Sequence, residues 1–411
     1  MCGAGRGSAL AGLRNRLRRG ARGGSGRNRG VCRRCRGKST RRDPSIDRRH
    51  GLYPRARPSR LEHAAPGAAP RSGRFGEPPD RCGARALGLA VSLGLDLAFD
   101  DAQEAIGATL RQFCADRLSD AAVKAQAAGL QREIWRELAE LGVLALATPE
   151  GEGGALELVA AVESLGAAVF PGPVAATCFA AQVLSQAERR RVISGEALVA
   201  VSDSAAAGSE PRLVPFATQA DLFVEVAGDR AFLAEPGGAV EPVDTLGGEV
   251  WGRVVLRRGA ELAGVARARV VHDLVLAAYT AAAGLRLVDD TAEHAKARRQ
   301  FGRSIGEFQA VAHPLADSWM QLVSGQELAR AAAFDFDAGD LAKARLRAGA
   351  ARIAAARAGV ETAHTCHQLF GAIGITLEGP VFRVSRRLRQ LASQPPDDSP
   401  AREALLADFG L

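Results

Sequence analysis

Two pairs of cysteine or histidine residues have a spacing that could bind a metal ion. Cys32-Arg-Arg-Cys35 has the spacing of half a zinc site, and His364-Thr-Cys-His367 places two imidazoles on one helical stretch. A structural zinc site needs four convergent ligands, but no second pair follows Cys35 at a suitable distance and no third ligand accompanies the histidines. We therefore predict no metal site, and we expect His364 and His367 to serve packing or hydrogen bonding.

Two segments rich in Arg, Gln and Gly carry the strongest local signals. The first reads Ala297-Arg-Arg-Gln-Phe-Gly-Arg-Ser-Ile-Gly-Glu-Phe-Gln309, and the second reads Gln368-Leu-Phe-Gly-Ala-Ile-Gly-Ile-Thr-Leu-Glu378. Local rules alone make Gly302 and Gly371 helix ends and Gly374 a turn. Each segment by itself is a weak signal, so its meaning depends on the elements around it.

Those elements follow an α, β, α order. A capping-box pattern at Asp100 or Asp101, with Gln103 or Glu104 three residues on, begins a helix, and further helical segments continue to about residue 185. Short β-type runs then predict antiparallel strands of a small barrel or sandwich. These runs cover 198–202, 221–226, 231–234 and 250–256. Four long helical segments follow and predict a four-helix bundle. They cover about 266–299, 307–335, 341–369 and 378–391.

The sequence therefore predicts an α+β multidomain fold. It consists of an N-terminal helical domain over 91–194, a middle β domain over 195–263 and a C-terminal four-helix bundle over 264–411. The longest uncharged apolar stretches fall short of the roughly 18 residues that a membrane helix needs. Three scattered body cysteines, Cys114, Cys178 and Cys366, exclude a disulfide scaffold and fit a reducing, cytoplasmic setting.

Residues 1–90 differ in composition from the rest. They hold 23 of the 54 Lys and Arg residues and five of the 46 acidic ones, so the body carries more acidic than basic groups. Such a segment has too little apolar content to offset the entropy of ordering, and we expect disorder. The favoured interpretation is that translation starts at Val91 and that the tail is not native. A basic transit-type helix and nucleic-acid binding are the alternatives.

The two segments and the α, β, α order resemble the acyl-CoA dehydrogenase family of flavoproteins. The family pattern Arg-x-x-Phe-Gly-x-x-Ile, with a Gln eight residues after the Phe, is matched by Arg298, Phe301, Gly302, Ile305 and Gln309. The later pattern Gln-x-x-Gly-Gly-x-Gly is matched by Gln368, Gly371 and Gly374, with Ala372 in place of the second Gly. The likeness extends over about 91–411.

The resemblance implies that FAD lies between the β domain and the bundle and reaches across a subunit interface. Arg298 would bind the diphosphate, and Gln309 would hydrogen-bond the cofactor. The turn from Gln368 to Ala372 would contact the FAD of a neighbouring subunit, so dimers or tetramers are expected. The implied cofactor-binding residues are Arg298, Phe301, Gln309, Gln368, Leu369, Phe370, Gly371 and Ala372.

The general base of this family is missing from its expected positions. A carboxylate, nearly always Glu, removes the α-proton of the acyl thioester while the β-hydride passes to the flavin. Those positions fall here near Gln394-Pro395, and near His272-Asp273 or Tyr279 on the first bundle helix. The nearest carboxylates are Asp273, Asp397 and Asp398. The catalytic residue stays unassigned, and either one of these Asp residues or a partner subunit would have to supply the base.

The function that the resemblance implies is α,β-dehydrogenation of an acyl-CoA thioester to its 2,3-enoyl form. An electron-transfer flavoprotein or a similar acceptor would take the electrons. The alternative is a non-catalytic subunit that completes the FAD site of a heteromeric dehydrogenase, in homo- or hetero-oligomers with a homologous chain. We expect Arg383, Arg386, Arg387 and Arg389 to form a solvated face or interface pairs, with the phosphates of coenzyme A as the alternative partner.

Overall fold

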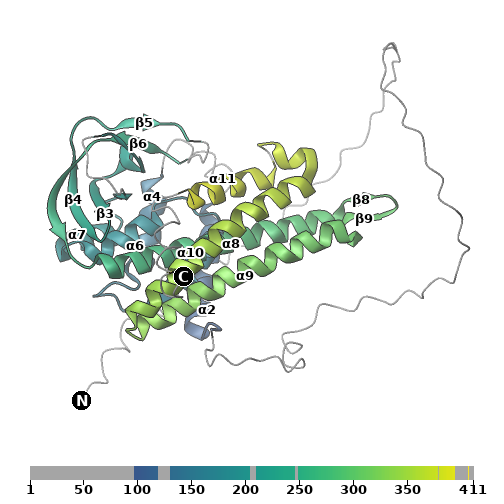
Figure 1. Cartoon of the computed structure of the whole chain (residues 1–411), viewed down its shortest axis with the longest axis horizontal. Coiled ribbons are helices and arrows are strands. Elements are labelled where there is room, and N and C mark those ends of the chain that lie inside the picture. Colours follow the sequence, from purple (N-terminus) through teal and green to yellow (C-terminus); the bar gives the residue numbers. More distant parts are fainter. Residues whose placement is uncertain are drawn as a thin grey trace, which may run out of the picture. The chain divides into compact units, whose positions relative to one another are not determined.

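The computed structural model describes residues 97–118, 130–203, 210–245, 249–377, 379–393 and Leu406. The tail 1–90, the proposed start at Val91 and the carboxylates of Asp397 and Asp398 lie outside these residues. Within the described part, the elements follow the α, β, α order that the sequence predicts (Figure 1).

The N-terminal helices form around one buried tryptophan. Helix α2 begins at a capping box, in which the Asp100 carboxylate accepts from the backbone of Gln103 and the Gln103 side chain accepts from the backbone of Asp100. Trp135 is fully buried in the core that these helices share with the bundle. The helices are α2 (Asp101–Arg117), α4 (Arg132–Glu140), α5 (Ala155–Ala167), α6 (Val174–Val183) and α7 (Gln186–Ile193), with the short η3 (Val143–Ala145).

The middle domain contains two sheets. One has the strand order β1-β3-β4-β7 and the other the order β2-β6-β5. Apolar side chains from both sheets, including Val214, Phe223 and Val254, share one cluster. The strands are β1 (Val199–Asp203), β2 (Arg212–Pro215), β3 (Leu222–Ala227), β4 (Arg230–Pro236), β5 (Glu241–Val243), β6 (Trp251–Val254) and β7 (Leu256–Leu262), with η4 at Ala217–Gln219.

The strand pairing differs from the sequence prediction in two ways. Strand β1 pairs with β3 in parallel, not antiparallel, because the chain visits the other sheet through β2 before it returns. The run expected at 250–256 is divided at Val255 between β6 and β7, which belong to different sheets. Strands β2 and β5, of four and three residues, were not predicted from the sequence.

The C-terminal bundle agrees with the predicted helical segments to within about two residues at each end. It consists of α8 (Val265–Ala297), α9 (Gln309–Asp337), α10 (Leu341–Phe370) and α11 (Pro380–Ala392). The hairpin β8 (Arg299–Gln300) and β9 (Arg303–Ser304), followed by η5 (Ile305–Glu307), joins α8 to α9, and η6 (Gly371–Ile375) precedes α11. Figure 1 shows the hairpin at the opposite end of the bundle from the two sheets.

Helix α8 is the central element of the bundle. By length and composition it is apolar enough to cross a membrane, which the sequence prediction did not anticipate, but 78% of its most apolar window is buried inside the fold. The apolarity therefore serves core packing against α5, α6, α9, α10 and α11. Small residues allow close approach, since a Cβ at Gly284 would lie 2.5 Å from Leu322 of α9.

Candidate functional site

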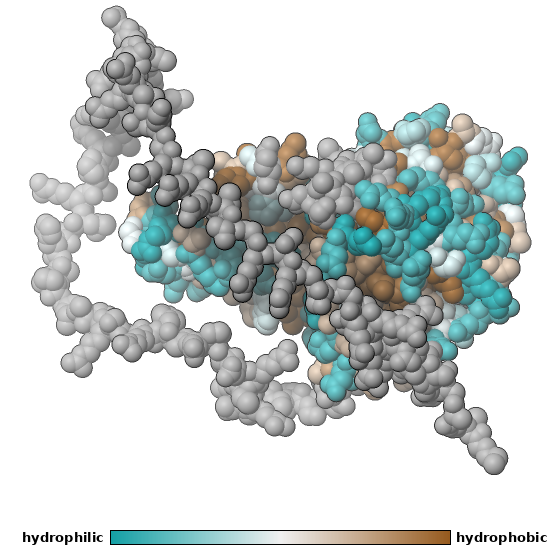
Figure 2. All heavy atoms as spheres, turned by 180° about the vertical axis from the view of Figure 1, so that it is seen from behind, coloured by the Kyte–Doolittle hydropathy of each residue, from teal (hydrophilic) through white to brown (hydrophobic). Residues whose placement is uncertain are grey.

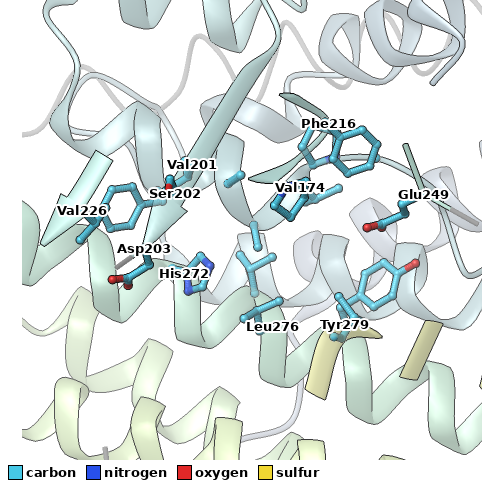
Figure 3. Close-up of a pocket in the computed structure, with 18 of the residues that line it drawn as sticks. Val174, Val201, Ser202, Asp203, Phe216, Val226, Glu249, His272, Leu276 and Tyr279 are labelled. Carbon is cyan, nitrogen blue, oxygen red and sulfur yellow. The ribbon is translucent and has the colours of Figure 1, made fainter. Parts of the chain in front are cut away.

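A cavity lies where the β domain meets α6, α8 and α11. Its walls come from α6, from strands β1 to β3, from Glu249 just before β6, and from α8 and α11. Figure 3 shows His272 and Tyr279 rising from α8, with Ser202 and Asp203 at the His272 end and Phe216 and Glu249 at the Tyr279 end. Its volume is about 70 Å³. Pockets that enclose a whole ligand measure about 300–1,000 Å³, so this cavity is too small to enclose one.

Charged groups at the His272 end are fixed by ion pairs. Arg269 of α8 donates to the Asp203 carboxylate at 3.0 Å and to the carbonyl of Gly228 at 2.6 Å. These bonds tie the end of β1 to the first turns of α8. The Asp203 carboxylate is thus engaged by a guanidinium.

His272 is oriented by a half-buried carboxylate on its own helix. Its Nδ1 lies 3.3 Å from Oδ1 of Asp273, and that oxygen accepts from Arg352 of α10 at 3.1 Å. Burial alone would raise the pKa of Asp273, but the hydrogen bond from His272 and the charge of Arg352 outweigh it, so this pKa is lowered. Phe179 of α6 meets the imidazole edge-on, with the ring centroids 6.1 Å apart. Asp273 itself points toward Arg352 and does not line the cavity.

The Tyr279 end holds a second buried ion pair. Glu249 contacts Arg387 and Gln390 of α11, and it accepts from the indole N–H of Trp251 at 3.3 Å. Burial lowers the pKa of Arg387 to about 9. The Tyr279 hydroxyl donates to the carbonyl of Phe170 at 2.7 Å, so it is already engaged.

The arginines of α11 correct one expectation from the sequence. Arg387 is buried against Glu249 and is not solvated, and Arg383 is half-buried, donating to the carbonyls of Ala168 and Val169 at 3.3 Å. Of the four arginines considered, only Arg389 is exposed. The reason is that α11 packs against α8 and α10, so side chains one turn apart on its inner face are enclosed.

The residues matched to the flavin motifs gather at the far end of the bundle. Arg298 ends α8, Phe301 lies at the tip of the β8–β9 hairpin with 91% of its surface exposed, and Gln309 begins α9. Gln368 and Leu369 form the last turn of α10. Phe370 is buried there, whereas Gly371 and Ala372 are exposed. None of these eight residues lines the cavity described above.

This end of the bundle has the donors that a diphosphate and polar cofactor groups need. The side chains of Arg298, Gln309 and Gln368 are exposed and have no hydrogen-bond or ion-pair partner among the residues that the structure describes. Gly371 has a φ of +64°, and a Cβ added there would meet nothing within 4 Å, so the backbone is open to a ligand. Unpaired guanidinium and amide donors beside open backbone fit a dinucleotide phosphate chain.

One histidine of α10, His367, has a structural role, whereas His364 is exposed. His367 lies 2.8 Å from the carbonyl of Gly374 and 2.8 Å from the hydroxyl of Ser385, so both ring nitrogens are occupied. It thereby holds η6 and α11 against the end of α10.

Sequence reasoning missed Glu249 and did not separate His272 from Asp273. Glu249 belongs to no motif, and its position in the cavity depends on how the segment before β6 folds over α11. The sequence indicated that His272 and Asp273 lie on the first bundle helix. It did not indicate which of the two faces the cavity, because that depends on the orientation of α8 about its own axis.

Comparisons with known proteins agree with the sequence motifs. The family model described as acyl-CoA dehydrogenase, N-terminal domain, matches residues 100–187, and that described as acyl-CoA dehydrogenase, C-terminal domain, matches residues 268–393. Together they take in more than half of the chain.

Individual relatives extend over the same region. Acyl-CoA dehydrogenase IpdE2 of Mycobacterium tuberculosis is 29% identical over 306 residues, which cover 70% of this chain and 92% of the relative. The crystal structure of the ChsE4-ChsE5 complex from Mycobacterium tuberculosis is similar with a TM-score of 0.67 at 22% identity, covering 77% of this chain and 99% of that one. The FAD complex of PigA is similar with a TM-score of 0.66 at 22% identity, covering 77% and 100%.

Proposed function

This chain belongs to the acyl-CoA dehydrogenase family, and we propose that it is an FAD-dependent flavoprotein that oxidises an acyl-CoA thioester to its 2,3-enoyl form. Its cofactor is FAD, in keeping with the flavin motifs and with the FAD complex of the similar protein PigA. The observation that carries the proposal is the set of unpaired donors, Arg298, Gln309 and Gln368, at one end of the bundle.

Each motif residue has a role that its position allows. The Arg298 guanidinium would bind the diphosphate, because a planar cation with several N–H donors suits phosphate oxygens. The amides of Gln309 and Gln368 would hydrogen-bond polar groups of the cofactor, and Gly371 would let backbone approach it. Phe370 is buried and would anchor this turn in the core. When bound, FAD accepts two electrons from the substrate.

The cofactor would be shared between two subunits. The motif residues lie at the far end of the bundle from the sheets and do not line the cavity. The motif residues of one subunit would therefore contact an FAD molecule whose isoalloxazine ring is bound by a second subunit. Exposed apolar side chains around the hairpin and η6 support such a contact. They are Phe301, Ile373, Ile375 and Leu377. Apolar areas also interrupt the hydrophilic surface of the face in Figure 2.

The second candidate is a subunit of a heteromeric dehydrogenase in which a homologous chain supplies the base. One observation favours it, because both carboxylates that line the described cavity are paired with arginine, Asp203 with Arg269 and Glu249 with Arg387. A solved relative, ChsE4-ChsE5, is itself a complex of two named chains. In either case, an electron-transfer flavoprotein or a similar acceptor would reoxidise the flavin.

The test is anaerobic flavin reduction. The chain is purified alone and together with homologous chains encoded beside it, and its flavin spectrum is recorded before and after a series of acyl-CoA thioesters is added. Reduction by the chain alone supports the self-sufficient enzyme, and reduction only by the mixed complex supports the heteromer. A protein that binds no flavin under either condition contradicts both.

A further inference from the structure

The cavity lacks a carboxylate free to act as a base among the residues that the structure describes. Asp203 is held by Arg269 at 3.0 Å, and Glu249 is held by Arg387 and Gln390. Both carboxylates are therefore already engaged by arginine side chains. The remaining titratable side chains that line the cavity are His272 and Tyr279, and the Tyr279 hydroxyl is committed to Phe170.

The contacts of His272 decide which of its nitrogens faces the cavity. Asp273 keeps its negative charge because Arg352 lies 3.1 Å away, so it acts as an acceptor for a proton on Nδ1 of His272, 3.3 Å away. A neutral imidazole with its proton on Nδ1 has a lone pair on Nε2. Since Nδ1 is turned to Asp273, Nε2 is the atom left for a ligand in the cavity (Figure 3).

The groups around the imidazole are fixed on every side that the structure describes. Phe179 of α6 packs edge-on against the ring. Asp203 of β1 forms an ion pair with Arg269 of α8, and Arg352 of α10 forms an ion pair with Asp273. The ring therefore has a defined orientation, as a base needs if it is to meet a substrate C–H bond.

We propose that His272 is the general base that accepts the α-proton of the acyl thioester in this chain, a step that rests on the proposed dehydrogenase function. The α C–H bond breaks and an N–H bond forms at Nε2. The electron pair of the broken bond becomes the α,β double bond, and FAD, when bound, would supply the two-electron oxidant that takes the β-hydrogen with its electron pair. Asp273 is then a positioning residue, which fixes the tautomer and stabilises the imidazolium.

The first test follows proton exchange and needs no net oxidation. The FAD-loaded protein, or its complex if it purifies as one, is incubated with butyryl-CoA in D2O, and deuterium at the α-carbon is measured by mass spectrometry. His272→Asn keeps an N–H that can reach Asp273 but removes Nε2, and it should slow exchange at least about 100-fold. His364→Gln, on the exposed face of α10, is the matched control and should exchange at the wild-type rate.

A second variant tests whether a different base at residue 272 recovers proton exchange. His272→Glu places a carboxylate on the same turn of α8 and should recover exchange, with a pH profile displaced toward acid because carboxylates titrate below imidazoles. Asp273→Asn should slow exchange by up to about 10,000-fold while leaving butyryl-CoA affinity unchanged, since its effect is on the tautomer. Wild-type exchange in His272→Asn would overturn the proposal.

A second measurement is independent of any substrate. Histidine-selective 15N labelling gives the tautomer of each ring by NMR, and the signal missing in His272→Asn identifies His272. The proposal requires the Nδ1–H form. A proton on Nε2, or a ring that exchanges freely between the two forms, would remove the lone pair from the cavity and overturn the proposal.

The two hypotheses fail differently. If wild type reduces its flavin with acyl-CoA and His272→Asn does so equally fast, the base assignment is wrong and the dehydrogenase function stands. If wild type exchanges α-protons in a His272-dependent way but never reduces flavin, the base assignment stands and the oxidation is wrong.

Discussion

His294 of α8 stacks on Phe370 of α10, with the ring centroids 4.3 Å apart and the planes 18° from parallel. His294 lies one helical turn before Arg298, and Phe370 lies two residues after Gln368. The stack therefore fastens together the ends of two long helices, and with them the two segments that sequence analysis singled out. Offset aromatic pairs of this kind contribute about 0.5–1.5 kcal/mol beyond the area they bury.

Replacing His294 with Phe should make folding stability less sensitive to acid. Burial and the charge of Arg298 lower the pKa of His294 from its ordinary value of 6.5, so the unfolded chain takes up this proton at a higher pH than the folded chain. The neutral His294 therefore contributes its full stabilisation of the folded state above the ordinary pKa of 6.5, and this stabilisation is lost as the pH falls through the lowered pKa. In His294→Phe the stack remains and the titration disappears. Urea unfolding at several pH values checks this, and an unchanged pH slope would contradict it.

Arg298→Gln should weaken FAD binding by about 10- to 100-fold, because a hydrogen bond to a charged group contributes about 1.5–3 kcal/mol. The measurement is a flavin fluorescence titration of the apoprotein. Arg286→Gln is the control, since Arg286 is an exposed arginine of the same helix that pairs with Asp290 at 2.8 Å. Equal losses in both variants would mean that the effect is general charge and not a diphosphate contact.

The helical parts of the fold could be predicted from the sequence because their signals are local. The four bundle helices show long apolar periodicity, and Gly371, with its positive φ, ends α10. Gly302, also expected at a helix end, lies instead in the turn between β8 and β9, because α8 already ends at Ala297. The two sheets were harder to predict from the sequence. A short strand such as β5 has few residues from which to read alternation, and the parallel pairing of β1 with β3 depends on the path of the chain through the second sheet.

For the candidate site, the sequence patterns reach only the residues that one motif holds. Arg298, Gln309 and Gln368 lie in continuous patterns, and the structure brings them to one end of the bundle. Glu249 and Arg387 come from segments 138 residues apart, and no local pattern links them before the chain folds. The partners of His272 likewise come from α6 and α10, so its orientation is a property of the packed bundle.

Glu225→Gln should destabilise the β domain. It should also make the free energy of unfolding fall less steeply as the pH is lowered. Glu225 is buried on β3 and accepts from Arg258 at 3.0 Å and from Arg212. Burial alone would raise the pKa of Glu225, but these hydrogen bonds outweigh it and lower the pKa. The ion pair therefore adds stability above the ordinary carboxyl pKa and loses it as the pH falls through the lowered one.

Removing the charge leaves two arginines around a neutral amide, and breaking a buried pair typically costs about 3–5 kcal/mol. Chemical unfolding near neutral pH measures this loss. Glu261→Gln is the comparison, because Glu261 pairs with Arg230 at 2.6 Å on the exposed side of the same sheet and its removal should have little effect. A similar loss in both variants would show that burial is not what distinguishes Glu225.

Gly284→Ala tests how closely α8 and α9 must approach. A Cβ at residue 284 would lie 2.5 Å from one methyl carbon of Leu322 and 3.0 Å from the other, and Leu322 is fully buried, so its side chain has little room to move. Overpacking of this kind costs about 1–3 kcal/mol, and thermal unfolding should register it as a lower Tm. Adding Leu322→Ala removes the clash, so the double variant should lose less than the sum of the two single losses. Additive losses would mean that the two residues do not limit the approach of the helices.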